Sequence, residues 1–322
     1  MTKIIKYKTV KNFKENLNYK DGNVLTIGFF DGVHIGHQKV LKNGKKLSLE
    51  KNIPFVVLTF HPHPNEIIFP DRKFPLLTSL ENRIKLIMDF GVDVIIVIPF
   101  TKEFSLLTKE GFLEEIVKNR INPKDLVIGE DFRFGYKADG NIEFLLEYFK
   151  NQDISVNVIP LLKIDKSIIS STLIRKLIIN GEISYANKLL GRNFEVYGSV
   201  IKGRGVGSSI GFPTLNIKKL KEILLPGDGI YLGQVKFDNS KKYCLINIGK
   251  RPTFDGKRRT VETYILDIEE DEIKKLRELG LLKLYFIKKL RDEIKFESVE
   301  KLVEQIKRDI KKAREIIKSI NF

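Results

Sequence analysis

The sequence predicts a parallel, doubly wound α/β domain followed by a small antiparallel β-barrel with a long C-terminal helix. Between residues 24 and 180, short apolar segments alternate with segments of helical periodicity. That alternation is typical of a parallel sheet covered by helices. From Glu195 onward, short strand-like segments are separated by Gly and Pro, which is typical of antiparallel strands in a barrel.

The alternation gives a definite order of elements in the first half. A short helix and turn at 182–191 follow it, and we place the domain boundary there, giving domains 1–184 and 185–322. Strands are expected over 24–27, 54–59, 93–99, 125–128 and 155–160, and helices over 36–50, 80–90, 109–120, 141–151 and 171–180.

In the second half, one amphipathic helix is expected over 298–321, with Ser298 as its N-cap. The barrel strands are expected over 195–203, 229–237, 242–249, 260–268 and 282–287.

The composition is that of an ordinary globular protein, with 42% hydrophobic and 30% charged residues in a chain of 322. Its apolar stretches are far shorter than the ~20 residues that span a bilayer. The N-terminus has no continuous apolar region of a signal peptide. Cys244 is the one cysteine, which fits a reducing compartment. We therefore expect a cytoplasmic protein with no membrane partner.

The net charge of +16 raises the question of nucleic-acid binding. Residues 1–184 carry 27 Lys and Arg against 22 Asp and Glu, and residues 185–322 carry 30 against 19. The excess is lysine spread along the chain, without the aromatic pattern of an RNA-binding module. This favours a solvated basic surface that draws in anionic substrates, and no nucleic-acid partner is expected. A basic nucleic-acid-binding protein is the alternative of a different class.

The segment V-L-T-I-G-F-F-D-G-V-H-I-G-H at 24–37 combines an apolar strand, a glycine-containing turn and a helix start. Such an arrangement binds anions, because the free amides and the dipole of the helix point into the crevice. His34 and His37 would share one face, and all four histidines lie between positions 34 and 63. Structural histidines and a zinc site are the alternatives. Zinc is disfavoured because H-E-x-x-H and nearby cysteines are lacking.

Three further segments lie where a parallel sheet gathers its ligands. T-F-H-P-H-P-N-E at 59–66 has prolines on both sides of His63, which favours a rigid ligand-facing loop over a strand. V-I-G-E-D-F-R-F-G at 127–135 could hold a planar ring and a phosphate, or simply pack its aromatic rings. I-S-S-T-L-I-R at 169–175 suits either a polyphosphate or an ordinary N-cap with a solvated arginine.

The second half has a glycine run, G-R-G-V-G at 203–207, ahead of Thr214 and Asn216. Thr214 and Asn216 are spaced by two in an extended segment, so the hydroxyl and the carboxamide face the same way. Neutral oxygens of this kind suit Mg²⁺ carried by a nucleotide. No G-x-x-x-x-G-K-[ST] pattern is present, which disfavours a P-loop ATPase.

Glu262 lies in V-E-T-Y-I-L-D-I and shares strand parity with apolar and aromatic residues, including Tyr264 and Leu266. Its carboxylate would therefore lie on an apolar face. An unpaired carboxylate there is costly, so Glu262 is either a working group or a member of an ion pair.

Taken in order, these motifs resemble those of the bacterial bifunctional riboflavin kinase/FMN adenylyltransferases, also called FAD synthetases. H-I-G-H resembles the H-x-G-H signature of the nucleotidyltransferase superfamily, and the resemblance covers essentially the whole chain. The other matching segments are G-E-D-F-R-F-G, I-S-S-T-L-I-R, P-T-L-N, V-E-T-Y, N-I-G-K-R-P-T-F and K-L-R-D-E-I-K-F.

The resemblance implies a Rossmann-like nucleotidyltransferase domain followed by a riboflavin kinase barrel. The barrel would phosphorylate riboflavin to FMN, and the first domain would join FMN to ATP, giving FAD and pyrophosphate without a covalent intermediate. ATP would be the co-substrate and Mg²⁺ the metal. His34 and His37 would neutralise phosphate charge, and Glu262 would be the general base of the kinase.

The resemblance also implies the binding residues of both sites. In the adenylyltransferase, the residues implied for ATP are Gly28, Phe29, Asp31, His34, His37, Ser170, Ser171, Thr172 and Arg175, and those implied for the flavin are Phe60, Pro62, His63, Pro64, Asp131, Phe132 and Arg133. In the kinase, the residues implied for ATP are Gly203, Gly205, Gly207, Thr214 and Asn216, those for the flavin are Arg291 and Phe296, and those for Mg²⁺ are Thr214 and Asn216.

The chain departs from the family pattern at three places. Leu215 stands where alanine is usual, Tyr264 stands where histidine is usual, and E-E-D-E-I-K-K-L-R-E-L-G-L at 269–281 replaces a D-L-Y-G turn. Leu215 would point to the opposite face and affect packing, whereas the other two departures affect the flavin side of the kinase site. A chain in which the kinase half has lost activity is therefore the alternative within the same class, and the oligomeric state stays open.

Overall fold

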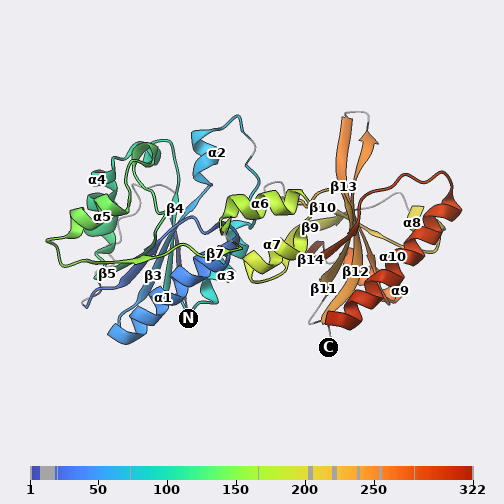
Figure 1. The fold of residues 1–322 in the computed structure, drawn as a ribbon, viewed down its shortest axis with the longest axis horizontal. Helices are drawn as coiled ribbons and strands as arrows, with labels where there is room; N and C mark the ends of the chain where they lie inside the picture. Colours follow the sequence, from blue (N-terminus) through green and yellow to red (C-terminus); the bar gives the residue numbers. More distant parts are fainter. Residues whose placement is uncertain are drawn as a thin grey trace. The chain divides into compact units, whose positions relative to one another are not determined.

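The structure is a computed structural model with two compact units, Met1–Ser171 and Thr172–Phe322 (Figure 1). The contact boundary lies at the start of helix α6 (Ser171–Ile179), whereas the sequence-based boundary lies in α7 (Ile183–Leu190). The boundary at 184 stays a prediction. The structure describes all residues except 1, 8–18, 20, 73, 166, 202–205, 220–222, 238–239, 254–255, 279 and 321–322.

A six-stranded parallel sheet forms the centre of the first unit, in the order β1-β4-β3-β2-β5-β6. The predicted doubly wound parallel sheet is confirmed. The order reverses between β2 and β5, and ligands of such sheets bind beside that point, at the carboxyl ends of the strands. The strands are β1 (Lys3–Lys6), β2 (Val24–Ile27), β3 (Phe55–His61), β4 (Val94–Pro99), β5 (Asp125–Gly129) and β6 (Ser155–Ile159).

Alternating strand residues build two apolar cores, one on each face of this sheet. Val24 and Val57 belong to the core beneath α1 and α3, whereas Leu25 and Val56 belong to the core beneath α5 and a π-helical segment, η4. Both faces are therefore covered, as a parallel sheet requires. The helices of this unit are α1 (Ile35–Lys51), α2 (Pro64–Ile68), α3 (Leu80–Met88), α4 (Lys109–Gly111), η4 (Phe112–Ile121) and α5 (Ile142–Phe149).

Some details of the first unit differ from the sequence-based expectation. The helix expected over 109–120 divides into α4 and the π-helical η4. Residues Lys3–Lys6, for which no strand was predicted, pair with β4 as the edge strand β1. This strand pairs with β4 alone and is mostly exposed, so its sequence lacks the apolar pattern of a buried strand. A short hairpin of β7 (Lys163–Ile164) and β8 (Ser167–Ile168) precedes α6.

The second unit contains a closed antiparallel barrel in the order β10-β13-β12-β11-β14-β9. The predicted antiparallel barrel is confirmed. Helix α9 (Glu270–Glu278) lies in the segment that replaces the family's turn, and the sequence analysis did not foresee it. The strands are β9 (Phe194–Ile201), β10 (Leu215–Lys219), β11 (Gly229–Phe237), β12 (Ser240–Thr253), β13 (Gly256–Ile265) and β14 (Leu281–Arg291), and a short helix α8 (Val206–Ser209) precedes β10.

The long helix α10 (Val299–Ile320) packs on the outer face of the barrel, where Ala313 contacts a cluster that includes Leu232, Leu245 and Leu290. Ser298 accepts a hydrogen bond from the amide of Lys301, as its predicted role of N-cap requires.

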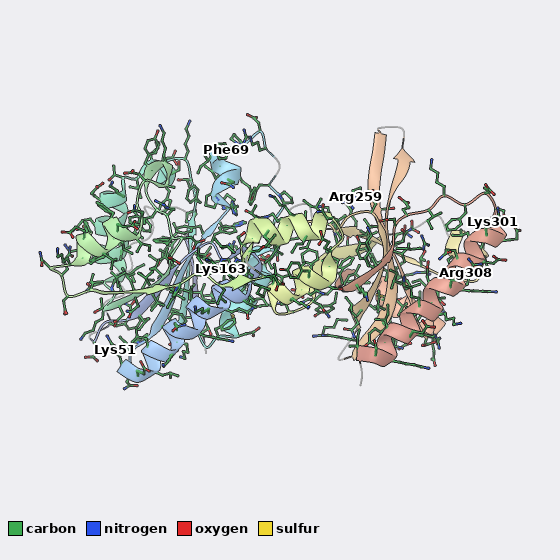
Figure 2. All side chains as sticks on the ribbon, viewed as in Figure 1. Lys51, Phe69, Lys163, Arg259, Lys301 and Arg308 are labelled. Atoms are coloured by element: carbon green, nitrogen blue, oxygen red, sulfur yellow. The ribbon has the colours of Figure 1, made fainter. Side chains whose placement is uncertain are left out.

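Basic side chains extend from the opposite side of α10 (Figure 2). Arg308 is 73% exposed and pairs with Glu304, and Lys301 is 62% exposed and pairs with Glu297. Such exposed pairs contribute little to stability. Within the described residues, no helix is both long and apolar enough to cross a bilayer.

Candidate functional site

The two predicted histidines meet at the start of α1, directly after β2 and a short 3₁₀ turn (Asp31–Val33). His34 is the N-cap, and its Nδ1 accepts a hydrogen bond from the amide of His37 at 3.3 Å. The two imidazole rings stack with centroids 3.6 Å apart. A Cβ at Gly36 would lie 3.1 Å from the His34 ring, so glycine leaves room for this cap. The sequence therefore brings two imidazoles to a helix amino end, where anions bind.

Asp31 fastens the histidine loop to a neighbouring segment. It is 2% exposed, and its carboxylate accepts hydrogen bonds from the amides of Leu77 and Thr78 at 3.0–3.1 Å. Ser171, the first residue of α6, donates its hydroxyl to the carbonyl oxygen of Asp31 at 3.0 Å. The structure thus joins the two predicted segments at Ser171. Thr172 and Arg175 lie further along α6, and their contact with ATP stays a prediction.

The segment 59–66 runs from the end of β3 to the first turn of α2, so the expected loop is limited to Pro62 and His63, which lie between the two elements. His63 is the N-cap of α2, and its Nδ1 accepts a hydrogen bond from the amide of Asn65 at 3.0 Å. The carboxylate of Glu66 accepts a hydrogen bond from the amide of His63 at 3.3 Å, which completes a capping box. The ring of His63 also lies 4.2 Å from that of Phe29. Two predicted members of the site are therefore in contact.

Arg83 on α3 is a residue that the sequence analysis missed. It is 1% exposed, its Nη2 donates to the carbonyl of Phe60 at 2.6 Å, and its Cζ lies 3.8 Å from the centre of the Phe29 ring. Burial lowers the pKa of Arg83 to about 10, although the nearby Asp31 opposes that shift. In the described structure, its Nε and Nη1 have no hydrogen-bond partner. The sequence did contain a signal for this residue: Arg83 lies four residues before Ile87 and so falls on the apolar face of the helix.

The loop after β5 carries the third predicted segment. Asp131 and Arg133 are exposed, and Phe132 is partly buried and stacks on Phe134 with ring centroids 5.4 Å apart. Phe134 belongs to the core. Phe134 is buried, whereas Phe132 packs against the same core and remains partly exposed.

The second site is a cavity of 440 Å³ on the barrel face that α10 covers in part. Five residues predicted from the sequence line it, and Asn216 is not among the lining residues. Gly203 and Gly205 lie outside the described residues. The lining residues used below are Gly207, Phe212, Thr214, Ile230, Leu245, Asn247, Glu262, Tyr264, Arg291, Glu293, Phe296 and Asp309.

The strand parity predicted for Glu262 is correct. Glu262 and Tyr264 both line the cavity, whereas Val261 and Thr263 are buried on the other face of β13. Strand register places Asn216 of β10 directly beside Glu262. Side chains in register on neighbouring antiparallel strands lie on the same face. The carboxylate and the predicted metal ligand are therefore neighbours.

Gly207 shapes the edge of this cavity next to Thr214. The amide of Phe212 donates to the carbonyl of Gly207 at 2.7 Å. A Cβ on Gly207 would lie 2.4 Å from the carbonyl oxygen of Phe212, a distance that no side chain tolerates. Gly207 therefore lets the chain return closely enough to set Thr214 at the cavity.

The comparisons with known proteins follow the same division. Residues 17–173 match the family model described as FAD synthetase, and residues 190–317 match the one described as riboflavin kinase. The chain belongs to the bifunctional riboflavin kinase/FMN adenylyltransferase family.

Its relatives of that name include the protein of Buchnera aphidicola (Schizaphis graminum), 36% identical over 94% of this chain and 96% of the relative. The Haemophilus influenzae protein is 34% identical over 92% and 95% of the two chains, and the Bacillus subtilis protein is 32% identical over 90% and 91%. A crystal structure described as a macrolide-efflux protein from Streptococcus pneumoniae has a TM-score of 0.86 and 31% identity, with 97% of this chain and 98% of that chain covered.

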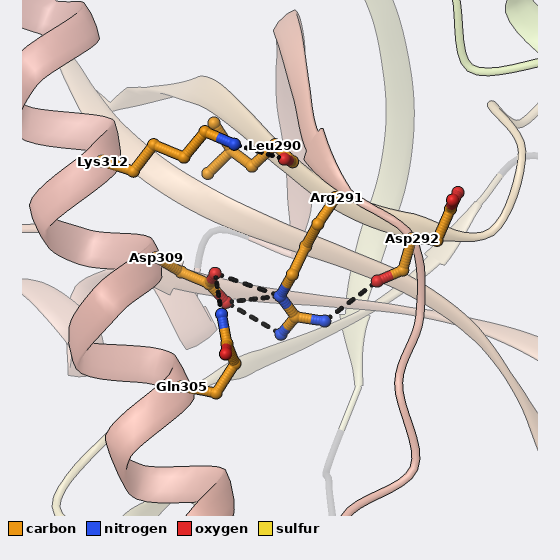
Figure 3. Close-up of polar contacts among 6 residues, drawn as sticks. All are labelled: Leu290, Arg291, Asp292, Gln305, Asp309 and Lys312. Atoms are coloured by element: carbon orange, nitrogen blue, oxygen red, sulfur yellow. Dashed lines mark hydrogen bonds and ion pairs between the residues drawn. The ribbon is translucent and has the colours of Figure 1, made fainter.

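Arg291, the flavin contact implied by the riboflavin kinase resemblance, is held by α10 (Figure 3). Its Nε and Nη2 donate to the Asp309 carboxylate at 2.8–3.0 Å, and its Nη1 donates to the carbonyl of Asp292. Gln305 donates to the same carboxylate at 2.9 Å. Lys312 completes the attachment by donating to the carbonyl of Leu290 at 2.7 Å. Arg291 is therefore positioned by a bidentate ion pair at the cavity wall.

We expect Asp309→Ala to loosen α10 from the barrel. Asp309 is 5% exposed and Arg291 is 15% exposed, and breaking a buried pair costs about 3 kcal/mol because it leaves one charge unpaired. Hydrogen exchange of the α10 amides should accelerate strongly. Asp267→Ala is the matched control, because Asp267 pairs with Arg314 of the same helix while 73% exposed. Equal exchange in the two variants would contradict the expectation.

Proposed function

We propose that this chain carries out both activities of its family, phosphorylating riboflavin to FMN in the second unit and converting FMN to FAD in the first. ATP is the co-substrate of both reactions. Two observations support the proposal: His34 and His37 stack at a helix amino end in the first unit, and in the second unit Glu262 lines a cavity and is in strand register with Asn216.

In the kinase reaction, Glu262 takes the proton from the riboflavin 5′-hydroxyl as that oxygen attacks the γ-phosphorus of ATP, and ADP leaves. Arg291 and Phe296 line the part of the cavity that receives the flavin. The Thr214 hydroxyl and the Asn216 carboxamide supply the neutral oxygens that Mg²⁺ accepts, and the ion would neutralise charge on the phosphates. Asn216 suits this role because its strand register places it next to the carboxylate of Glu262.

In the adenylyltransferase reaction, a phosphate oxygen of FMN attacks the α-phosphorus of ATP, and pyrophosphate leaves. His34, His37 and the free amides of α1 stabilise the charge that develops on the phosphates. The hydroxyls of Ser170 and Ser171 hold the polyphosphate, and the resemblance to the family implies the same role for Thr172 and Arg175. The cap hydrogen bond to Nδ1 of His34 fixes the orientation of its ring at the start of α1.

The test is a time course with riboflavin, ATP and Mg²⁺, in which the flavins are separated by chromatography. A parallel reaction starts from FMN. FMN that appears before FAD supports both activities. FAD only from added FMN would mean that the kinase half is inactive, and no flavin product in either reaction would refute the proposal.

Because both reactions consume ATP and the chain has a single cysteine, we propose a cytoplasmic location.

Arg83→Met should slow FAD formation about tenfold and leave the free energy of unfolding within about 1 kcal/mol of the wild type. The lowered pKa of Arg83 corresponds to a cost of about 3 kcal/mol for burying its charge. Losing the hydrogen bond to the Phe60 carbonyl costs about 1–3 kcal/mol, which offsets that gain. The ring of Phe29, however, loses the cation that lies against it.

Urea unfolding and the rate of FAD formation from FMN measure the two effects. Arg72→Met is the control, since Arg72 is exposed and lies 5.2 Å from the Phe69 ring. It should change neither quantity. An Arg83→Met variant with an unchanged rate would show that the stacked guanidinium does not position Phe29.

A further inference from the structure

The cavity of the second unit contains a polar residue, Asn247, that takes no part in the proposed phosphoryl transfer. Asn247 of β12 lines the cavity, and in the described structure its Oδ1 is shielded from solvent without a hydrogen-bond partner. An unsatisfied buried acceptor costs about 1–3 kcal/mol. A neutral carboxamide oxygen in that position is suited to accept a hydrogen bond from a hydroxyl or an N–H group of a ligand.

The barrel register fixes where Asn247 lies in the site. Asn247 pairs with Glu262 on one side and with Ile230 on the other, and Ile230 pairs with Arg291. Asn216 pairs with Glu262 from the opposite side. Glu262 therefore has the predicted metal ligand on one neighbouring strand and Asn247 on the other, in the direction of Arg291.

The lining of the cavity separates in the same way. Ile230 and Leu245 give an apolar surface beside Asn247, and Phe296 adds an aromatic ring near Arg291. The substrate that receives the phosphate therefore meets two hydrogen-bond acceptors, the side chains of Glu262 and Asn247, next to an apolar wall. A molecule that joins a flat ring to a chain of hydroxyl groups matches this pattern.

We propose that Asn247 determines specificity for the acceptor substrate by accepting a hydrogen bond from a hydroxyl of its polyol chain, close to the hydroxyl that Glu262 deprotonates. This inference rests on the proposed kinase activity of the second unit. Asn247 recognises the chain, and the apolar wall recognises the ring. A flavin without the polyol should therefore bind independently of Asn247.

The experiment compares the binding of riboflavin and of lumiflavin, the same ring without the polyol, by quenching of flavin fluorescence. Asn247→Leu replaces the carboxamide with an apolar group of similar size on a face that already holds Leu245. The Kd and the KM for riboflavin should each rise about tenfold, the effect of one hydrogen bond. The Kd for lumiflavin should not change. Asn247→Asp keeps an acceptor oxygen and should retain the preference for riboflavin over lumiflavin.

Asn157→Ala is the matched control, because Asn157 is a half-buried asparagine on β6 of the other unit. It should leave FMN formation unchanged. Equal weakening of riboflavin and lumiflavin, or a lower kcat with an unchanged KM for riboflavin, would overturn the inference. A wild-type protein that forms no FMN would instead overturn the proposed kinase activity, so the two failures are distinguishable.

Discussion

Glu262→Gln should reduce FMN formation by about 10²–10⁴-fold, the usual contribution of a general base, while FAD formation from added FMN continues at the wild-type rate. Gln has nearly the same shape but cannot take the proton from the riboflavin hydroxyl. Glu262 also lines a cavity in the second unit, so the loss should be confined to one activity. The two rates are measured separately, from riboflavin and from FMN.

Glu278→Gln provides the comparison for Glu262, because Glu278 is an exposed carboxylate on α9 of the same unit. It should retain both activities. A Glu262→Gln variant that still makes FMN at the wild-type rate would remove Glu262 from its proposed role. Loss of both activities, with unchanged thermal unfolding, would contradict the assignment of separate sites.

His37→Ala should lower FAD formation about 10²–10³-fold and leave FMN formation from riboflavin intact. Removing one preorganised donor to a developing charge costs this much in comparable sites. The variant loses the imidazole that stacks on His34 and meets the edge of Phe30 at 5.3 Å. The backbone amide of residue 37 is unchanged, so the cap hydrogen bond to His34 can still form and α1 should keep its start.

His61→Ala is the control for His37, since His61 is an exposed histidine at the end of β3 in the same unit. FAD formation should persist in that variant. Hydrogen exchange of the β2 and β3 amides reports whether the first unit is folded. If folded His37→Ala formed FAD at the wild-type rate, the histidine pair would not act in adenylyl transfer.

The sequence by itself determined the class of both units and the position of most strands and helices. Val24–Ile27, the glycine turn and His34 could be placed because an apolar strand, a turn and a capped helix each leave a local pattern. The parity of Glu262 and Tyr264 could be predicted for the same reason, since side chains of a strand alternate between its faces. The family motifs then supplied roles that no local pattern contains.

The tertiary structure decided which residues from distant segments meet. Asn216, Glu262 and Asn247 become neighbours through strand register, and register depends on closing the barrel. Arg83 reaches Phe29 and Phe60 only because α3 packs on the sheet. His63 lies in the short connection between β3 and α2 and also caps α2, a contact that the sequence analysis did not foresee. Periodicity and spacing record the local preference of the chain, whereas contacts between segments depend on how the whole core packs, which no short stretch of sequence contains.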